Sequence, residues 1–205
     1  IFIGATDDNL LTGFNFEMEK TLPKKYKRAI KRAGFTYTQA AHIMPFLVAI
    51  HEMGHSYLQM KGLGYPNSKT FVLEETLANY FLYAFLKTKY PQLAIVWENI
   101  LEGYVVTQCP AHSTIKDFDE LYFGVTSKGG LGNFFWYQGK KQKMAKKLFD
   151  SEGLGFVKKM NQIVSLADSP DKSKVYEKLI ELNPLFKGWM ERFKPHHSCP
   201  GEKEE

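Results

Sequence analysis

The spacing of hydrophobic residues along the chain predicts a mostly helical protein. Apolar residues recur every three or four positions over much of the 205 residues, which is the period of helices with one buried face. Gly and Pro residues interrupt this pattern and mark the helix ends. Helices are therefore expected at 23–33, 37–60, 71–88, 92–107, 140–150, 155–166, 171–182 and 184–193.

Two segments near the N-terminus predict strands instead. Residues 1–3 form a short apolar run, and residues 11–19 alternate in part, with Phe14 and Phe16 two positions apart. The expected fold class is therefore α+β, predominantly α, with a small N-terminal sheet element and a helical C-terminal part.

Two further features modify this pattern. Pro45 lies inside the segment 37–60, so we expect either a kink or a new helix that begins there. Residues 108–133 contain a Cys-Pro pair and a Gly-Gly-Leu-Gly run, and are predicted to be irregular.

Composition and charge are those of an ordinary soluble globular protein. Hydrophobic residues make up 44% of the chain and charged residues 24%, and the length allows one well-buried domain, with or without a helical appendage. The net charge of +5 is modest. The basic segments 24–32 and 140–147 are interpreted as solvated helix faces rather than as a nucleic-acid-binding surface.

The cysteines and apolar runs limit which compartment and which kind of metal site the sequence favours. Cys109 and Cys199 lack CxxC spacing, which disfavours a disulfide framework or a cysteine zinc site and leaves a single bridge open. The apolar run 43–50 has eight residues and is too short to span a bilayer. No signal peptide is visible, which favours the cytoplasm, although the chain begins at Ile1 and an N-terminal segment could be missing.

The run His51-Glu52-Met53-Gly54-His55 carries the candidate chemistry. On a helix, His51 and His55 lie on one face one turn apart, where both imidazoles can reach one zinc ion. Glu52 is rotated from them and can approach a water on the metal. This is the HExxH arrangement of zinc enzymes.

A third ligand is expected from the next helix, because a catalytic zinc needs three protein ligands and one open position. That helix supplies two neighbouring carboxylates, Glu74 and Glu75. The small Ala78 after Glu75 would let the two helices pack closely. Asn79, one turn beyond Glu75, could hold the outer nitrogen of a ligating histidine.

These two runs, HEMGH at 51–55 and ETLAN at 75–79, resemble the gluzincin branch of zinc metallopeptidases. The second run is especially similar to the ImmA/IrrE-type peptidases. The resemblance covers residues 50–81, and the segment after Phe81 lacks the apolar-Pro ending of those peptidases. It favours Glu75 over Glu74 as the third ligand. It also implies one Zn²⁺ per chain, bound by His51, His55 and Glu75.

The same resemblance implies a fold and a mechanism. Residues 1–195 would form a single zincin-like metallopeptidase domain, helical from about residue 140, followed by a mobile polar tail at 196–205. The zinc would activate a water, and Glu52 would take its proton and deliver it to the leaving amine. A Tyr or His downstream would stabilise the oxyanion. The sequence offers His112, Tyr104, Tyr122 and Tyr137 without selecting among them.

The function expected from the sequence is a zinc-dependent metallopeptidase that hydrolyses a peptide or protein substrate. The first alternative is a zinc-binding regulatory or interaction module without peptidase activity. Glu52 argues against that alternative, because a structural zinc site has no need of a carboxylate there. The second is a basic nucleic-acid-binding protein with a chance HExxH, which the modest charge disfavours.

Overall fold

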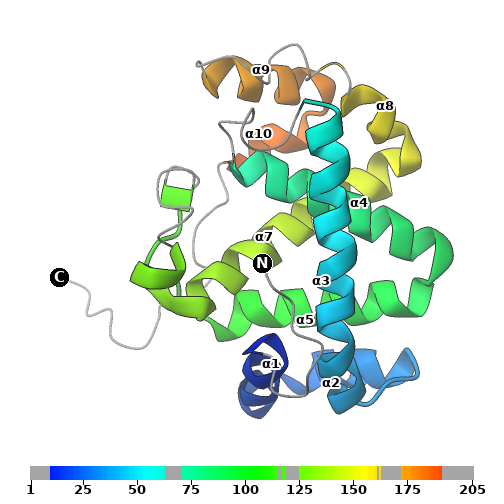
Figure 1. Ribbon diagram of the computed structural model, residues 1–205, viewed down its shortest axis with the longest axis vertical. Coiled ribbons are helices and arrows are strands. Elements are labelled where there is room, and N and C mark those ends of the chain that lie inside the picture. Colours follow the sequence, from blue (N-terminus) through cyan, green and yellow to red (C-terminus); the bar gives the residue numbers. More distant parts are fainter. Residues whose placement is uncertain are drawn as a thin grey trace.

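The structure is a computed structural model that describes residues 10–62, 71–114, 117–118, 125–160, 162 and 172–190. All regular secondary structure in this described part is helical (Figure 1). The longer helices are α1 (Leu10–Thr21), α2 (Lys24–Arg32), α3 (Tyr37–Met60), α4 (Phe71–Lys89), α5 (Pro91–Thr107), α7 (Val125–Glu152) and α9 (Lys172–Leu182). A 3-10 turn at Gly153–Gly155 joins α7 to α8 (Phe156–Met160), and α10 (Leu185–Met190) follows α9.

The expected α+β class with its N-terminal sheet element is wrong for the described residues, where the fold is all-α. The predicted strand at 11–19 lies within helix α1, and residues 1–3 lie outside the described part of the chain. Phe14, Met18 and Leu22 pack into one core cluster, and their four-residue spacing is that of a helix. The Phe pair two positions apart suggested a strand, but only Phe14 packs into this cluster.

The helices predicted between residues 23 and 107 are confirmed, whereas the segment after them begins its helix earlier than expected. Helix α7 begins at Val125, inside the region predicted to be irregular, and is interrupted at Gly130, where φ is 70°. Further along α7, a Cβ atom at Gly139 would collide with the carbonyl oxygen of Leu101. Gly139 therefore allows α7 to pack closely against α5.

Cys109, just after α5, is disulfide-bonded.

Helix α3 carries the HEMGH run and passes through Pro45 without restarting. It begins at a capping box: the Thr36 side chain accepts a hydrogen bond from the Gln39 backbone, and the Gln39 side chain accepts one from the Thr36 backbone. The expectation of a new helix at Pro45 is therefore wrong. Proline removes one backbone donor, and the rest of the 24-residue helix continues around that loss.

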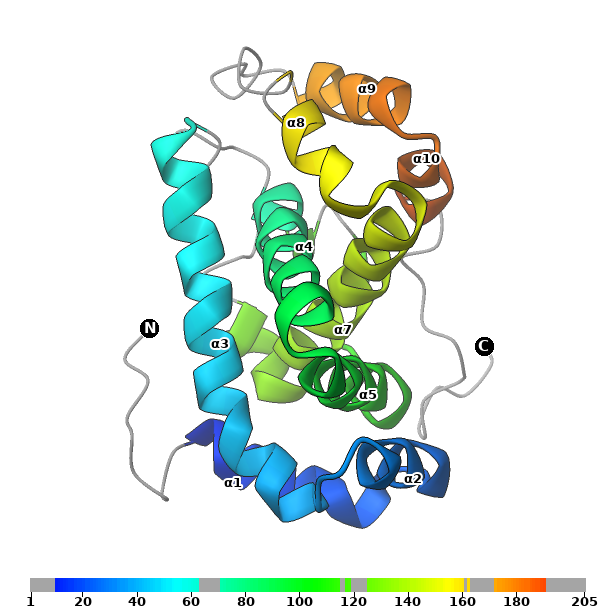
Figure 2. The ribbon, with the colours of Figure 1, turned by 90° about the vertical axis from the view of Figure 1, so that its right-hand side faces the viewer.

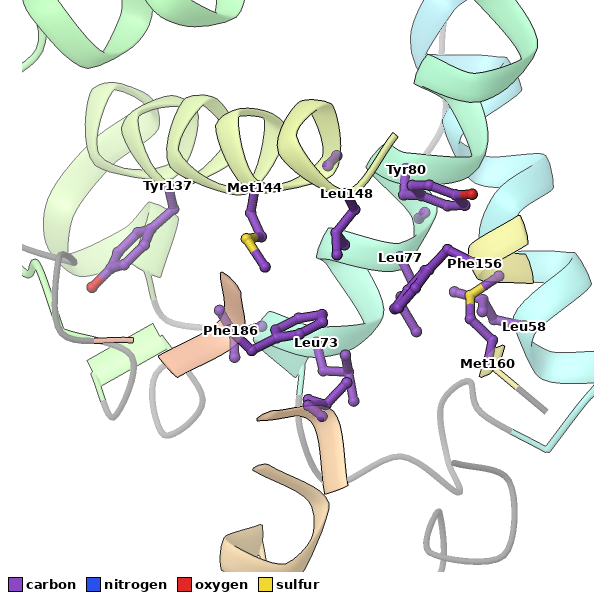
Figure 3. Close-up of a cluster of buried hydrophobic side chains, with 14 of the residues drawn as sticks. Leu58, Leu73, Leu77, Tyr80, Tyr137, Met144, Leu148, Phe156, Met160 and Phe186 are labelled. Carbon is purple, nitrogen blue, oxygen red and sulfur yellow. The ribbon is translucent and has the colours of Figure 1, made fainter. Parts of the chain in front are cut away.

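Helix α4 lies between α3 and α7 (Figure 2). The side chains of residues 72–80 are all buried, so this part of the helix is enclosed on every face. Figure 3 shows Leu73 and Leu77 of α4 near Met144 and Leu148 of α7, and Tyr80 beside Phe156, in one of the two hydrophobic core clusters of the described residues. A helix enclosed in this way normally carries apolar residues all round. Glu74, Glu75 and Asn79 break that rule, because they are buried on α4 with 6%, 3% and 0% of their surface exposed.

The other core cluster lies where α1, α2 and the first half of α3 pack against α4 and α5. Asn15 of α1 is buried there and accepts hydrogen bonds from the hydroxyl groups of Tyr37 and Tyr104. This packing holds the N-terminal half of α3, and hence the start of the HEMGH run, against the rest of the molecule. Within the described residues, no helix combines the length and apolar character needed to cross a bilayer.

Candidate metal centre

Two small residues set how closely α3 and α4 approach at the HEMGH run. A Cβ atom placed on Gly54 would lie 3.1 Å from the Cα atom and 3.2 Å from the carbonyl oxygen of Ala78. Such separations are shorter than ordinary van der Waals contact, so the crossing depends on the absence of a side chain at Gly54. The expectation that Ala78 permits close packing is confirmed. The histidines on either side of Gly54 are thereby brought against the first turns of α4.

His51, His55 and Glu75 converge at this crossing. The Nε2 atoms of the two histidines are 3.1 Å apart. Glu75 Oε2 lies 3.4 Å from His51 Nε2, and Glu75 Oε1 lies 3.5 Å from His55 Nε2. Ligand atoms around one tetrahedral metal at 2.0–2.1 Å would be about 3.3–3.4 Å apart. The three side chains therefore form a group that could hold a metal ion.

Glu74 orients one of these histidines. Its Oε1 atom lies 3.0 Å from His55 Nδ1, so the carboxylate can accept the hydrogen of that ring nitrogen and leave Nε2 directed at the other two side chains. Burial acts to lower the pKa of His55, but the hydrogen bond that its ring donates to Glu74 and the charges of the nearby carboxylates outweigh burial and raise that pKa. His51 Nδ1 has no equivalent partner among the described residues.

The expectation that Asn79 holds a ligating histidine is wrong. Asn79 instead supports Glu75 through the side-chain amide of Gln138. Its Nδ2 atom donates to Gln138 Oε1 at 3.0 Å and to the Glu75 carbonyl at 2.9 Å. Gln138 Nε2 in turn donates to Glu75 Oε2 at 2.6 Å. Since Asn79 occupies the amide oxygen of Gln138, the amide nitrogen must face Glu75. Gln138 was missed because nothing in its local sequence links it to a residue on α4.

Lys141 of α7 brings a buried positive charge to the same carboxylate. Its Nζ atom lies 3.6 Å from Glu75 Oε2 and 3.7 Å from the ring centroid of Phe118, and the side chain is fully buried. Burial would raise the pKa of Glu75, but Lys141 and the two histidines hold it well below its usual value. The interpretation of 140–147 as a solvated face is wrong for Lys140 and Lys141, which are 5% and 0% exposed.

Comparisons of the chain with protein-family models, with curated proteins and with solved structures return no match.

Glu52 lies next to the three converging side chains without joining them. It follows His51 on α3, is half-buried, and is close enough for its charge to contribute to the raised pKa of His55. No described residue forms a hydrogen bond or an ion pair with its carboxylate. The carboxylate is thus available to a molecule that enters beside the histidines.

The candidate oxyanion donors that the structure describes form hydrogen bonds with residues outside the group of His51, His55 and Glu75. The Tyr104 hydroxyl is buried and donates to Asn15 at 3.0 Å, in the other core cluster. The Tyr137 hydroxyl donates to the Thr114 carbonyl at 2.9 Å. His112 is half-buried and exchanges backbone hydrogen bonds with the Asn133 side chain. Tyr122 lies outside the described residues.

Proposed function

We propose that this protein is a zinc-dependent metallopeptidase whose metal is bound by His51, His55 and Glu75. The observation that carries the proposal is the convergence of two Nε2 atoms and one carboxylate at the separations of a tetrahedral site. They come from an HExxH run and from the following helix, and the half-buried Glu52 lies beside them.

The donor set supports zinc and a catalytic role. Two imidazoles and one carboxylate are typical zinc ligands, and three protein ligands leave a fourth position for water or substrate, as catalytic zinc sites require. Zinc bound there would polarise a peptide carbonyl and lower the pKa of a bound water to about 7. The buried position of His51 and Glu75, which are 5% and 3% exposed, favours a rigid site.

Each side chain then has one task. Glu74 keeps the hydrogen of His55 on Nδ1, so that Nε2 is the binding atom. Gln138 fixes the orientation of the Glu75 carboxylate through Oε2. Glu52 acts as general base: its carboxylate takes the proton of the attacking water and later delivers it to the nitrogen of the leaving amine.

The experiment measures zinc per chain and cleavage of a broad peptide library, for the wild type and for Glu52→Gln. We expect one zinc per chain in both proteins, and a fall in turnover of about 10²–10⁴-fold in the variant, because Gln keeps the size of the side chain and removes the base. Loss of zinc in the variant would make Glu52 a ligand. Equal turnover in both would refute its role as base.

The same experiment separates the proposal from its main alternative. A zinc-binding regulatory or interaction module would bind one zinc through the same three residues and cleave nothing. A fully zinc-loaded wild type that leaves every library peptide intact would therefore refute the peptidase and favour the module.

A further inference from the structure

Lys141 places a charged side chain in the buried interior of the protein. Its side chain is fully buried on α7, and removing an ammonium group from water is strongly unfavourable unless the charge is paired. A residue such as Met would fill similar space without that cost. The charge itself therefore calls for a role, and Glu75 is a charged side chain beside it, with Oε2 at 3.6 Å from Lys141 Nζ.

The contacts from α7 fall on one oxygen of the Glu75 carboxylate. Both Gln138 Nε2, at 2.6 Å, and Lys141 Nζ, at 3.6 Å, approach Oε2. The other oxygen, Oε1, points to His55 Nε2 at 3.5 Å. Helix α7 thus holds the carboxylate by one oxygen, and the two contacts differ in kind: Gln138 supplies a neutral hydrogen bond and Lys141 a full positive charge.

The charge balance of the cluster gives Lys141 its effect. Glu52, Glu74 and Glu75 bring three negative charges, and Lys141 brings a positive charge 3.6 Å from Glu75 Oε2. A bound divalent ion makes the formal charge of this group zero when both histidines are neutral. Without Lys141, the same ion would sit in a group of net negative charge, which would bind it more tightly and screen more of its charge.

We propose that Lys141 is a positioning residue that tunes the metal site: its ammonium offsets the charge of Glu75, so that the bound ion keeps more of its polarising power and is held less tightly. The inference rests on the proposed metal site and adds its regulation by α7. Gln138 has the opposite effect on affinity, because it orients the ligand without opposing the charge of the ion.

Substitutions of these two neighbours should therefore move metal affinity in opposite directions. Lys141→Met removes a positive charge near the ion, and zinc affinity should rise on the order of tenfold. Gln138→Met removes the hydrogen bond that orients Glu75, and affinity should fall about 10–100-fold. A purely structural role for Lys141 predicts a fall in both variants, since loss of a packing residue loosens the site.

The test is a competition titration of Zn²⁺ between the full chain and a chromogenic chelator. Lys141→Gln repeats the charge removal with a side chain that can still donate to Glu75, and it keeps the test decisive if Lys141→Met does not fold. Lys146→Met is the matched control: it removes one charge from the same helix, where the ammonium pairs with Glu98 at 3.5 Å and Asp150 at 3.1 Å. Its zinc affinity should stay near that of the wild type.

Tighter binding in the Lys141 variants, with Lys146→Met unchanged, supports the inference. Equal or weaker binding in the Lys141 variants overturns it and leaves the proposed function standing. A wild type that binds no zinc overturns the proposed metal site, and this inference with it.

Discussion

Glu74 and Glu75 are consecutive acidic residues that make different contacts in the structure. Glu75 faces the Nε2 atoms of both histidines, whereas Glu74 contacts the far nitrogen of His55. The sequence alone allows either carboxylate to be the third metal ligand, and the resemblance to gluzincins favours Glu75. The distances agree with that choice, and they give Glu74 the histidine-holding role that we had expected of Asn79.

The two carboxylates should therefore differ under substitution. Glu75→Ala removes a ligand and should abolish stoichiometric zinc binding. Glu74→Ala removes only the partner of His55 Nδ1, so one zinc per chain should remain, with affinity lowered about 10–100-fold. Zinc titration of both variants measures this difference. Zinc retained by Glu75→Ala and lost by Glu74→Ala would exchange the two assignments.

Asn79 should act on zinc only through Gln138. Asn79→Ala frees the amide oxygen of Gln138 and lets that side chain turn, so zinc affinity should fall by a factor within the same 10–100-fold range. If the two residues form one chain of contacts, the double variant with Gln138→Met should bind zinc about as weakly as the worse single variant. Fully additive losses in a titration of all three variants would show that Asn79 has a separate effect.

At the scale of helices, the site depends on the close crossing of α3 and α4. Gly54→Val places a branched side chain against the backbone of Ala78, where a Cβ atom alone would lie 3.1 Å from the Cα atom. We expect a loss of about 1–3 kcal/mol in the free energy of unfolding, together with loss of zinc, because the helices must move apart.

Ala49→Val is the control for this prediction. It places the same branched residue on an exposed position of the same helix, so it shares the cost in helix propensity without the clash. Its stability should change by less than about 1 kcal/mol, and its zinc affinity should not change. Denaturant unfolding and zinc titration measure both variants. Equal effects of the two substitutions would mean that the crossing at Gly54 does not position the site.

The sequence predicted the helices and the candidate metal-binding side chains where the signal was local. His51, Glu52 and His55 lie within one helix, so their spacing was sufficient to single them out, whereas the choice of Glu75 over Glu74 near the start of the next helix came from the resemblance to gluzincins. The partial alternation at 11–19 was misleading, because Phe14, Met18 and Leu22 also have helical spacing, and burial decided between the two. The contribution of α7 could not be predicted, because contacts between Glu75 and residues more than sixty positions away leave no local pattern.

For the whole molecule, the candidate metal centre lies where two consecutive helices, α3 and α4, meet α7, which is distant from them in sequence. Helix α4 lies between α3 and α7 (Figure 2), and the first turns of α4 contact the histidines on one side and Gln138 and Lys141 on the other. A bound ion would link α3 directly to α4, while Gln138 and Lys141 of α7 contact the Glu75 carboxylate. Metal binding and the stability of the folded chain should therefore be coupled.

This coupling gives a prediction for the intact protein. An ion that binds the folded chain and not the unfolded chain stabilises it by about 2.7 kcal/mol at a free concentration 100 times the dissociation constant. For a chain of this length, that corresponds to a rise of roughly 5–10 °C in the midpoint of thermal unfolding. Zinc should produce this shift in the wild type, and a chelator should reverse it. His51→Ala separates the site from incidental binding, because it lacks one ligand and keeps every other histidine, including the adjacent pair His196 and His197. An equal shift in that variant would place the bound zinc elsewhere on the chain, and no shift in the wild type would mean that the site does not hold the ion.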